Sequence, residues 1–281
     1  MTTTTFFLVL FSAVVHATWN FMLKGSRSHK VSVIWLMQLL SGFFMLPICF
    51  LGFGPPDIAP EGWGWVGVTS CIHAGYVVLL GYAYERGNMS VVYPVARGVG
   101  VVGTALFAAV LALETIAAGG VVGVTLVALG ILLLGLRTIT ASDIKTLVIA
   151  IGVGLTIVCF SLVDKIGVTF VKPIYYVSFM NVFSSILLIP YMYAHLKEPT
   201  KFVWINERRK CFIIGMTALM TYLIIVYAYK QAPASYVVAL RETSIVSGVF
   251  LGVVVLKEKI TPKQIVGVVM ICLGAIVIRL S

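Results

Sequence analysis

The chain has 281 residues, of which 60% are hydrophobic and only 11% are charged, and its formal net charge is +10. Soluble globular domains are about one quarter charged, so this composition excludes an ordinary soluble protein and predicts a membrane protein. The basic residues are scattered through short polar stretches, so membrane topology explains the net charge better than nucleic-acid binding does. We therefore expect a lipid bilayer, and no nucleic acid, as a partner.

The five cysteines give no sign of a metal or redox site. None belongs to a CxxC pair, and each stands singly in or beside an apolar segment, where cysteine behaves as a small apolar side chain. We therefore expect neither a metal nor a cofactor. The first residues, MTTTTFFLVLF, lack the basic start of a signal peptide, so we expect the first apolar segment to be retained as a helix.

Ten apolar stretches follow one another, each long enough to cross roughly 30 Å of hydrocarbon as a helix. Strand-type alternation is absent from them. The sequence therefore predicts an all-α integral membrane protein with ten transmembrane helices. Their predicted limits are about 5–23, 31–53, 63–84, 89–113, 116–136, 145–163, 173–195, 210–230, 234–256 and 262–280.

The first span carries a polar stripe. Ser12, His16 and Asn20 are spaced by four residues and share one helix face, with Trp19 beside them. Such a face in a membrane helix is expected to contact protein or water. We expect Asn20 and Trp19 to contact a substrate. His16, which titrates near neutral pH, is a candidate proton carrier, and an interhelical hydrogen bond is the alternative.

Polar residues recur in three further spans. Gln38 in the second span and Asn181 in the seventh would orient a substrate or join helices. In the third span, His73 and Tyr76 lie one turn apart, so we predict Tyr76 as a substrate contact and His73 as a second proton-coupling candidate. Together with the tyrosines of the eighth span they could instead form an aromatic cage for a cation, or serve as ordinary bundle residues.

The fourth span contains VVYPVARGVGVVG, which places Arg97 inside an apolar helix. A charge at that depth costs on the order of 3 kcal/mol, so Arg97 is expected to face a cavity or a partner; snorkelling to the headgroups is the alternative. The string GVGVVG lacks the strand and turn of a dinucleotide site. Pro94 is expected to kink the helix and act as a hinge. Gly100, Thr104 and Ala108 form a small-residue stripe.

The ninth span repeats this arrangement 144 residues later. Arg97 falls on Arg241, and the stripe falls on Ser244, Gly248 and Gly252, so we expect the fourth and ninth spans to pack closely. The sequence places one carboxylate, Glu242, well inside a span.

Because adjacent helical residues point apart, the expected partner of Glu242 is Arg97, and Glu242 is a proton-coupling candidate. Two arginines and one glutamate leave a charge near +1, which favours a substrate with an anionic group; a salt-bridge lock between helices is the alternative. We place three other acidic residues at helix ends, solvated or capping, and outside the site: Glu114, Asp164 and Glu258.

The internal repeat divides the chain into two halves, 1–140 and 141–281, of five helices each. Because five is odd, the second half enters the membrane from the opposite side, which makes an inverted repeat. This architecture belongs to secondary transporters, whose site lies near the midplane between the halves. Further matches are Val110 on Val254, Gly123 on Gly267, Gly130 on Gly274, and YAYERGNMS on YAYKQAPAS.

The basic residues also predict an orientation. Connections after odd-numbered spans hold fourteen Lys and Arg residues, whereas the other side holds four. The positive-inside rule then puts the odd-numbered connections in the cytoplasm and both termini outside.

The sequence is similar to the EamA-type members of the drug/metabolite transporter superfamily. The similarity rests on the five-plus-five duplication, on HATWNFMLK and YPVARG, and on LKEKITPKQIVGVVMICLGAIVI at 256–278. It implies an inner-membrane carrier of small metabolites, with a cavity lined by central helices of both halves and with cytoplasmic termini, contrary to the charge count. The ITPKQ piece also predicts a capped start for the last helix.

We therefore predict a secondary active transporter for a small metabolite with an anionic group, such as an amino acid, organic acid or phosphonate. No ATP-binding loop is present in the sequence, so coupling to protons or exchange would drive it. The alternatives are an exporter of amphiphilic amines and a flippase for a lipid-linked phosphate. The spans show no nucleophile paired with a base, so we expect no enzyme. A monomer or a homodimer is expected.

Overall fold

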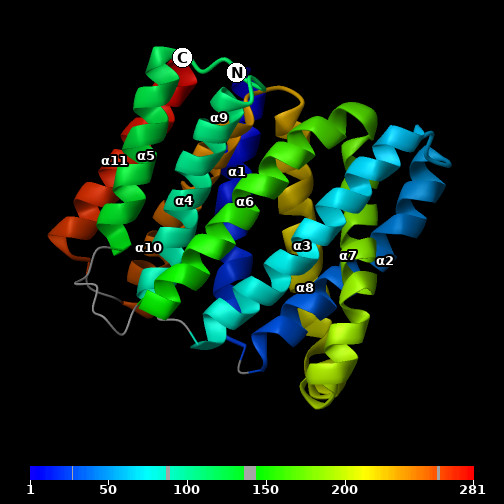
Figure 1. Ribbon diagram of the computed structural model, residues 1–281. Coiled ribbons are helices and arrows are strands. Elements are labelled where there is room, and N and C mark those ends of the chain that lie inside the picture. The colour runs from blue at the N-terminus through cyan, green and yellow to red at the C-terminus, as the bar shows by residue number, and fades with distance from the viewer. Residues whose placement is uncertain (27, 87–88, 136–143, 258–259) are drawn as a thin grey trace.

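The computed structural model describes residues 1–26, 28–86, 89–135, 144–257 and 260–281 (Figure 1). These residues form helices and no strands, and ten helical segments are long and apolar enough to cross a membrane, as predicted. The predicted division between residues 140 and 141 lies outside the described residues. The helices are α1 Thr3–Lys24, α2 Lys30–Phe53, α3 Pro60–Arg86, α4 Met89–Val110, α5 Ala118–Gly135, α6 Ile144–Phe170, α7 Pro173–His195, α8 Lys197–Tyr229, α9 Ala234–Arg241, α10 Ser244–Leu256 and α11 Pro262–Leu280.

The helices depart most from the predicted spans in three places. The sixth helix continues to Phe170 instead of stopping at 163, and the eighth begins at Lys197, so the basic stretch expected to be a polar connection is helical. The ninth span is broken into α9 and α10 at Glu242 and Thr243. In contrast, the capped start of α11 is confirmed, because Thr261 and Gln264 form a complete capping box.

The main contacts between helices have counterparts between the equivalent helices of the other half. The helices α2 and α7 are equivalent and contact each other, as do α5 and α11. Contacts of α3 with α6 correspond to contacts of α8 with α1, and contacts of α4 with α6 correspond to those of α9 and α10 with α1. An inverted repeat produces this pattern, because its twofold axis maps one half onto the other.

Glycines at the α5 and α11 interface obey the same symmetry. The hydrogen of Gly123 faces the backbone oxygen of Gly274, and Gly130 faces that of Gly267, so a Cβ atom added at either would lie within 2.9 Å of the oxygen. The sequence repeat equates Gly123 with Gly267 and Gly130 with Gly274, so the twofold axis exchanges the two contacts. These glycines let the two helix backbones approach closely.

The small-residue stripes do not join the fourth and ninth spans, contrary to our expectation. The helices α4 and α9 are in contact, but Gly100 packs against Ile157 of α6. The equivalent stripe on α10 is different: Gly248 is exposed, and a Cβ atom added there would meet no neighbouring atom within 4 Å. Small residues on a helix permit close packing, but the sequence does not specify which helix fills the space.

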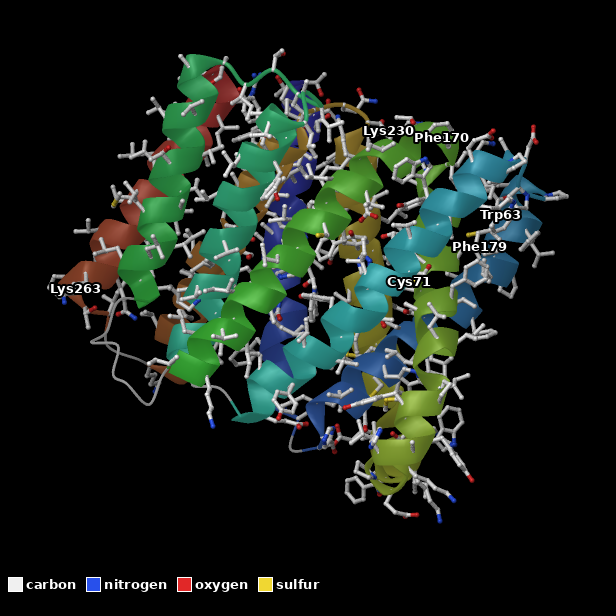
Figure 2. The ribbon with its side chains drawn as sticks, viewed as in Figure 1. Trp63, Cys71, Phe170, Phe179, Lys230 and Lys263 are labelled. Atoms are coloured by element: carbon white, nitrogen blue, oxygen red, sulfur yellow. The ribbon has the colours of Figure 1, made fainter. Side chains whose placement is uncertain are left out.

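Both chain termini lie at one end of the bundle (Figure 1), where the guanidinium of Arg279 donates to the Met1 carbonyl oxygen at 3.3 Å and to Thr3 Oγ1 at 2.7 Å. An even number of spans requires this placement. Figure 2 shows Lys230 at this end and Lys263 at the opposite end, which agrees with the predicted assignment of their connections to opposite sides.

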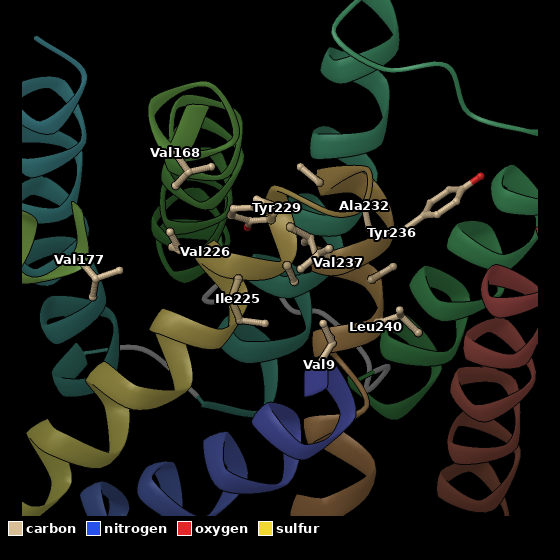
Figure 3. Close-up of a cluster of buried hydrophobic side chains, with 14 of the residues drawn as sticks. Val9, Val168, Val177, Ile225, Val226, Tyr229, Ala232, Tyr236, Val237 and Leu240 are labelled. Carbon is tan, nitrogen blue, oxygen red and sulfur yellow. The ribbon is translucent and has the colours of Figure 1, made fainter. Parts of the chain in front are cut away.

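The end that holds the termini is closed by apolar packing. All eight residues of α9 are buried, and they pack with α1, α6 and α8 in one large hydrophobic cluster (Figure 3). Glu114 caps α9 by accepting hydrogen bonds from the Ala234 amide and, at 2.9 Å, from Ser235 Oγ. The prediction that Glu114 acts as a cap is therefore confirmed. Labelled members of the cluster are Val9, Val168, Val177, Ile225, Val226, Tyr229, Ala232, Tyr236, Val237 and Leu240.

We predict that Gly130→Ala lowers the free energy of unfolding by about 1–3 kcal/mol, because the added methyl group meets backbone atoms that have no room to move. Thermal unfolding in detergent measures this. The matched control is Gly152→Ala, also in a helix, where a Cβ atom meets nothing within 4 Å; it should be neutral or stabilising by up to about 1 kcal/mol. Equal effects at both positions would contradict the close packing.

Candidate functional site

A cavity of about 120 Å³ lies among the central helices of both halves. It reaches from the middle of the bundle toward the end opposite the termini, because Leu23, Ile34 and Leu80 near that end line it. Eight of the eleven residues that the sequence analysis nominated line this one cavity: His16, Trp19, Gln38, His73, Tyr76, Arg97, Asn181 and Arg241.

Arg97 makes a buried ion pair with Glu242. The distance from Arg97 Nη1 to Glu242 Oε1 is 3.0 Å, and the two side chains are only 7% and 1% exposed. The pair joins α4 of the first half to the turn after α9 in the second half, which is the partnership expected from the sequence. The Arg97 guanidinium also lies 5.2 Å from the ring centre of Tyr93, within range of a cation–π interaction.

The same guanidinium fixes the protonation of His16. Arg97 Nη2 lies 2.9 Å from His16 Nε2, and a guanidinium can only donate hydrogen bonds. His16 Nε2 therefore accepts, and the imidazole is neutral with its proton on Nδ1. Trp19 packs edge-on against the ring at 4.8 Å. A proton arriving at Nε2 would have to displace Arg97, so protonation of His16 and this arginine contact exclude each other.

Arg241 lies at the break between α9 and α10. Its Nε atom is 3.9 Å from Glu242 Oε1, closer than we expected for neighbours on one helix. The reason is that the helix ends at Arg241, and Glu242 stands in a turn instead of on the next helical position. Glu242 itself does not line the cavity. Glu242 lies behind Arg97 and Arg241, and these two arginines line the cavity.

Three cavity-lining side chains have buried polar atoms without a hydrogen-bond partner among the described residues. They are Trp19 Nε1, Gln38 Oε1 and Arg241 Nε. Leaving such atoms unpaired costs about 1–3 kcal/mol each, so native proteins usually satisfy them with water or a ligand. All three belong to residues that the sequence analysis nominated as substrate contacts. These three side chains therefore have unused hydrogen-bonding capacity beside the cavity.

Aromatic rings form one wall of the cavity. His73, Tyr76, Phe160 and Tyr222 are in mutual ring contact, with centroids 4.6 to 6.4 Å apart. The other tyrosine considered from the sequence, Tyr229, is fully buried in the hydrophobic cluster and does not line the cavity.

Two nominated residues, Asn20 and Pro94, stand outside the cavity. The Asn20 amide donates to the His16 carbonyl oxygen of its own helix at 2.9 Å, and Asn20 does not line the cavity. Pro94 lies within α4 and also stands outside the cavity. Its ring packs onto Gly135 at the end of α5, where it occupies the space that a Cβ atom of Gly135 would need.

The sequence analysis was wrong about Asp164. It was placed at a helix end in contact with solvent, but α6 continues past it and the side chain is 0% exposed. Thr69 Oγ1 donates to Asp164 Oδ1 at 2.5 Å, Tyr176 OH donates to the same oxygen at 2.9 Å, and Tyr222 OH donates to Oδ2. The apolar residues after Asp164, IGVTF, were the signal that the helix continues.

Asp164 also changes the predicted charge balance. Among the described residues, the spans hold two buried carboxylates, Glu242 and Asp164, instead of the single one expected beside Arg97 and Arg241. The four side chains sum to zero when both acids are ionised and to +1 when one is protonated. Glu258, the third acid that we assigned to a helix end, lies outside the described residues.

Comparison with known proteins places the second half of the chain in a family. The EamA-like transporter family matches residues 144–280. This part of the chain is therefore similar to an EamA-like transporter domain. The family is part of the drug/metabolite transporter superfamily, so the similarity noted from the sequence is confirmed. Its members are membrane transporters, not enzymes.

One solved structure is similar in fold to this chain over nearly its whole length. It is described only as "Crystal structure of protein", has 15% sequence identity and a TM-score of 0.75, and the match covers 99% of this chain and 97% of the other. At that identity the likeness shows the fold alone. No curated protein matches the sequence.

We predict that Arg97 and Glu242, the ion pair at the centre of the protein, contribute to its stability as a unit. Glu242→Gln leaves two buried guanidinium groups without their anion, which should lower the free energy of unfolding by about 3–5 kcal/mol. Adding Arg97→Met removes one of these charges, so the double variant should be more stable than Glu242→Gln alone. Thermal unfolding in detergent tests this, with exposed Lys263→Met as the neutral control. Additive losses would contradict the coupling.

Proposed function

We propose that this protein is a secondary active transporter that moves a small metabolite with an anionic group across the inner membrane by alternating access. The observation that carries the proposal is the pair of cavity-lining arginines on equivalent helices, one of which has an unpartnered Nε atom. Glu242 binds Arg97, so Arg241 is the cation with unused hydrogen-bonding capacity. Carboxylate and phosphonate groups suit a guanidinium, which donates two parallel hydrogen bonds.

The polar side chains around the cavity would orient such a solute. Trp19 can donate through its indole nitrogen, and Gln38 can accept through its free oxygen. Asn181, Tyr76 and Arg97 line the same space. Amino acids, organic acids and phosphonates combine a small size with an anionic group, and a cavity of about 120 Å³ suits solutes of that class.

Coupling to protons would use the contacts around Arg97. A substrate anion that binds Arg97 competes with Glu242, which is one of the proton-coupling candidates. His16 is linked in the same way, since its Nε2 can take a proton only when Arg97 moves away. The cavity reaches toward the end opposite the termini. The charge count would make this arrangement inward-facing, whereas the cytoplasmic termini implied by the family resemblance would make it outward-facing.

A second candidate function rests on the aromatic wall. Rings of His73, Tyr76, Phe160 and Tyr222 could hold an amphiphilic amine by cation–π attraction. Two buried arginines oppose this reading, because they repel a cationic solute from the same cavity. We therefore place the anionic solute first.

Solute counterflow in proteoliposomes tests the proposal. A panel of amino acids, organic acids, phosphonates and quaternary amines should give exchange of anionic solutes in the natural protein. Arg97→Ala and Arg241→Ala should each reduce that exchange by at least tenfold, since a charge-assisted hydrogen bond lost from a buried site costs about 1.5–3 kcal/mol. Arg279→Ala, at the closed end outside the cavity, is the matched control and should transport normally.

Two results would overturn the anionic-solute proposal. The first is a panel in which no anionic solute exchanges, and the second is normal anion exchange by both cavity variants. A selective response to quaternary amines would instead support the aromatic wall as the binding surface. Exchange that needs a lipid-linked phosphate and no soluble solute would support a flippase.

A further inference from the structure

Asp164 forms the centre of a polar cluster that the proposed transport site does not use. Its carboxylate is fully buried and accepts hydrogen bonds from hydroxyl groups on three other helices: Thr69 on α3, Tyr176 on α7 and Tyr222 on α8. Within the part of the chain that the structure describes, no ion pair neutralises it. Burying a carboxylate without a counterion is costly. The hydrogen bonds from the three hydroxyl groups are what offset that cost when Asp164 is ionised.

A chain of hydrogen bonds leads from this carboxylate to the cavity. His73 Nδ1 lies 3.0 Å from the Thr69 carbonyl oxygen and 3.1 Å from Thr69 Oγ1. A carbonyl oxygen only accepts, so Nδ1 carries the proton and donates. Thr69 Oγ1 then uses its own proton toward Asp164. His73 lines the cavity, and its other nitrogen, Nε2, is the one left with a lone pair.

We propose that Asp164 is a proton-binding carboxyl reached from the cavity through His73 and Thr69, and that its protonation is linked to anion binding. The proposal rests on the transport function proposed above. A proton from cavity water binds His73 Nε2, the proton on Nδ1 passes to Thr69 Oγ1, and the Thr69 hydroxyl proton passes to Asp164 Oδ1. One proton has then moved from the cavity to Asp164, and His73 is again neutral with its proton on Nε2.

The step also changes the contacts that hold the helices together. Once Nδ1 has lost its proton, its lone pair faces the Thr69 carbonyl oxygen across 3.0 Å, and this contact is repulsive. In addition, the hydroxyl groups of Tyr176 and Tyr222 no longer bind an ionised acceptor, and charge-assisted hydrogen bonds are about twice as strong as neutral ones. Proton binding therefore loosens α7 and α8 from α6 and turns the His73 ring on α3.

The net charge of these four side chains determines whether protonation of Asp164 strengthens or weakens anion binding. With Asp164 ionised, the two cavity arginines are offset by two carboxylates. With Asp164 protonated, only Glu242 remains, so the cavity region has a charge of +1 and binds an anion more tightly. By reciprocity, a bound anion favours the protonated form. Proton and anion thus bind together.

The other titratable groups around Asp164 leave this sign unchanged. Its neighbour Lys165 points away and donates to the carbonyl oxygens of Tyr229 and Ala232. The groups that face Asp164 and His73 from the packed helices are His73 on α3, Tyr176 on α7, Tyr222 and Tyr229 on α8, and Arg241 on α9.

Infrared difference spectroscopy of the protein in liposomes tests the proton site without any substrate. Lowering the pH should produce a carbonyl stretching band of a protonated carboxylic acid, which Asp164→Asn abolishes. Asparagine keeps the accepting oxygen, so the cluster can persist. The Arg97→Met/Glu242→Gln double variant should retain the band. If Asp164→Asn does not fold, Tyr222→Phe serves, because Tyr222 OH donates to Oδ2, the carbonyl oxygen once the proton is on Oδ1, and loss of that hydrogen bond should move the band to higher frequency. A band unaffected by either change overturns the proposal.

Binding of malate, glutamate and methylphosphonate tests the linkage. For any of these probes that exchanges in counterflow, the half-saturating concentration in the natural protein should fall about tenfold as the pH is lowered, a typical size for coupling between two sites. In Asp164→Asn the half-saturating concentration should be the same at every pH and equal to the low-pH value of the natural protein. A pH response that persists in Asp164→Asn overturns the linkage. If no probe is transported, the proposed function fails, and the infrared band still decides whether Asp164 binds a proton.

Discussion

The ion pair between Arg97 and Glu242 is the interaction on which the centre of the protein depends. Two charges at this depth in a membrane are costly to bury, and the cost is offset because one guanidinium reaches Glu242 at 3.0 Å and His16 at 2.9 Å at the same time. These contacts join α4 to α1 and to the turn after α9. Residues from both halves of the chain are therefore fixed around one arginine, and the cavity lies beside it.

This arrangement requires the break in the ninth span. In a continuous helix, Arg241 and Glu242 would point about 100° apart, whereas here Arg241 Nε lies 3.9 Å from Glu242 Oε1 while Glu242 binds Arg97. At the turn of Glu242 and Thr243, backbone hydrogen bonds span three residues instead of the four of an α-helix. The Glu242 amide donates to the Ala239 oxygen and the Thr243 amide donates to the Leu240 oxygen, both at 3.1 Å. Irregular backbone in a membrane is tolerated where it is buried in protein or lines a cavity. The break thus lets a short segment present both signs of charge to the centre.

The sequence predicted the members of the cavity better than the details of their contacts. Arg97 and Arg241 were found because a charge in an apolar span is rare and because the repeat produces it twice. Asp164 was missed for a physical reason: helix ends are poorly marked when a single charged pair interrupts an apolar run, and the pair DK was read as the end of a span that continues to Phe170. The break after Arg241 could not be predicted either. The local sequence ALRETSIVSG has no proline or glycine at that point, and the equivalent helix α4 is continuous.

The two halves have equivalent sequences but different packing, and this difference bears on alternating access. On α4, Thr104 is fully buried and Gly100 packs tightly against α6. At the equivalent position on α10, Gly248 is exposed and touches nothing. In inverted-repeat transporters, the second state arises when each half adopts the packing of the other. If the halves exchanged packing, α10 would pack against α1 as closely as α4 packs against α6, and the space beside Gly248 would be filled as the space beside Thr104 is now. The small-residue stripes therefore mark a difference in packing between the two halves, because Thr104 on α4 is buried whereas Gly248 on α10 is exposed.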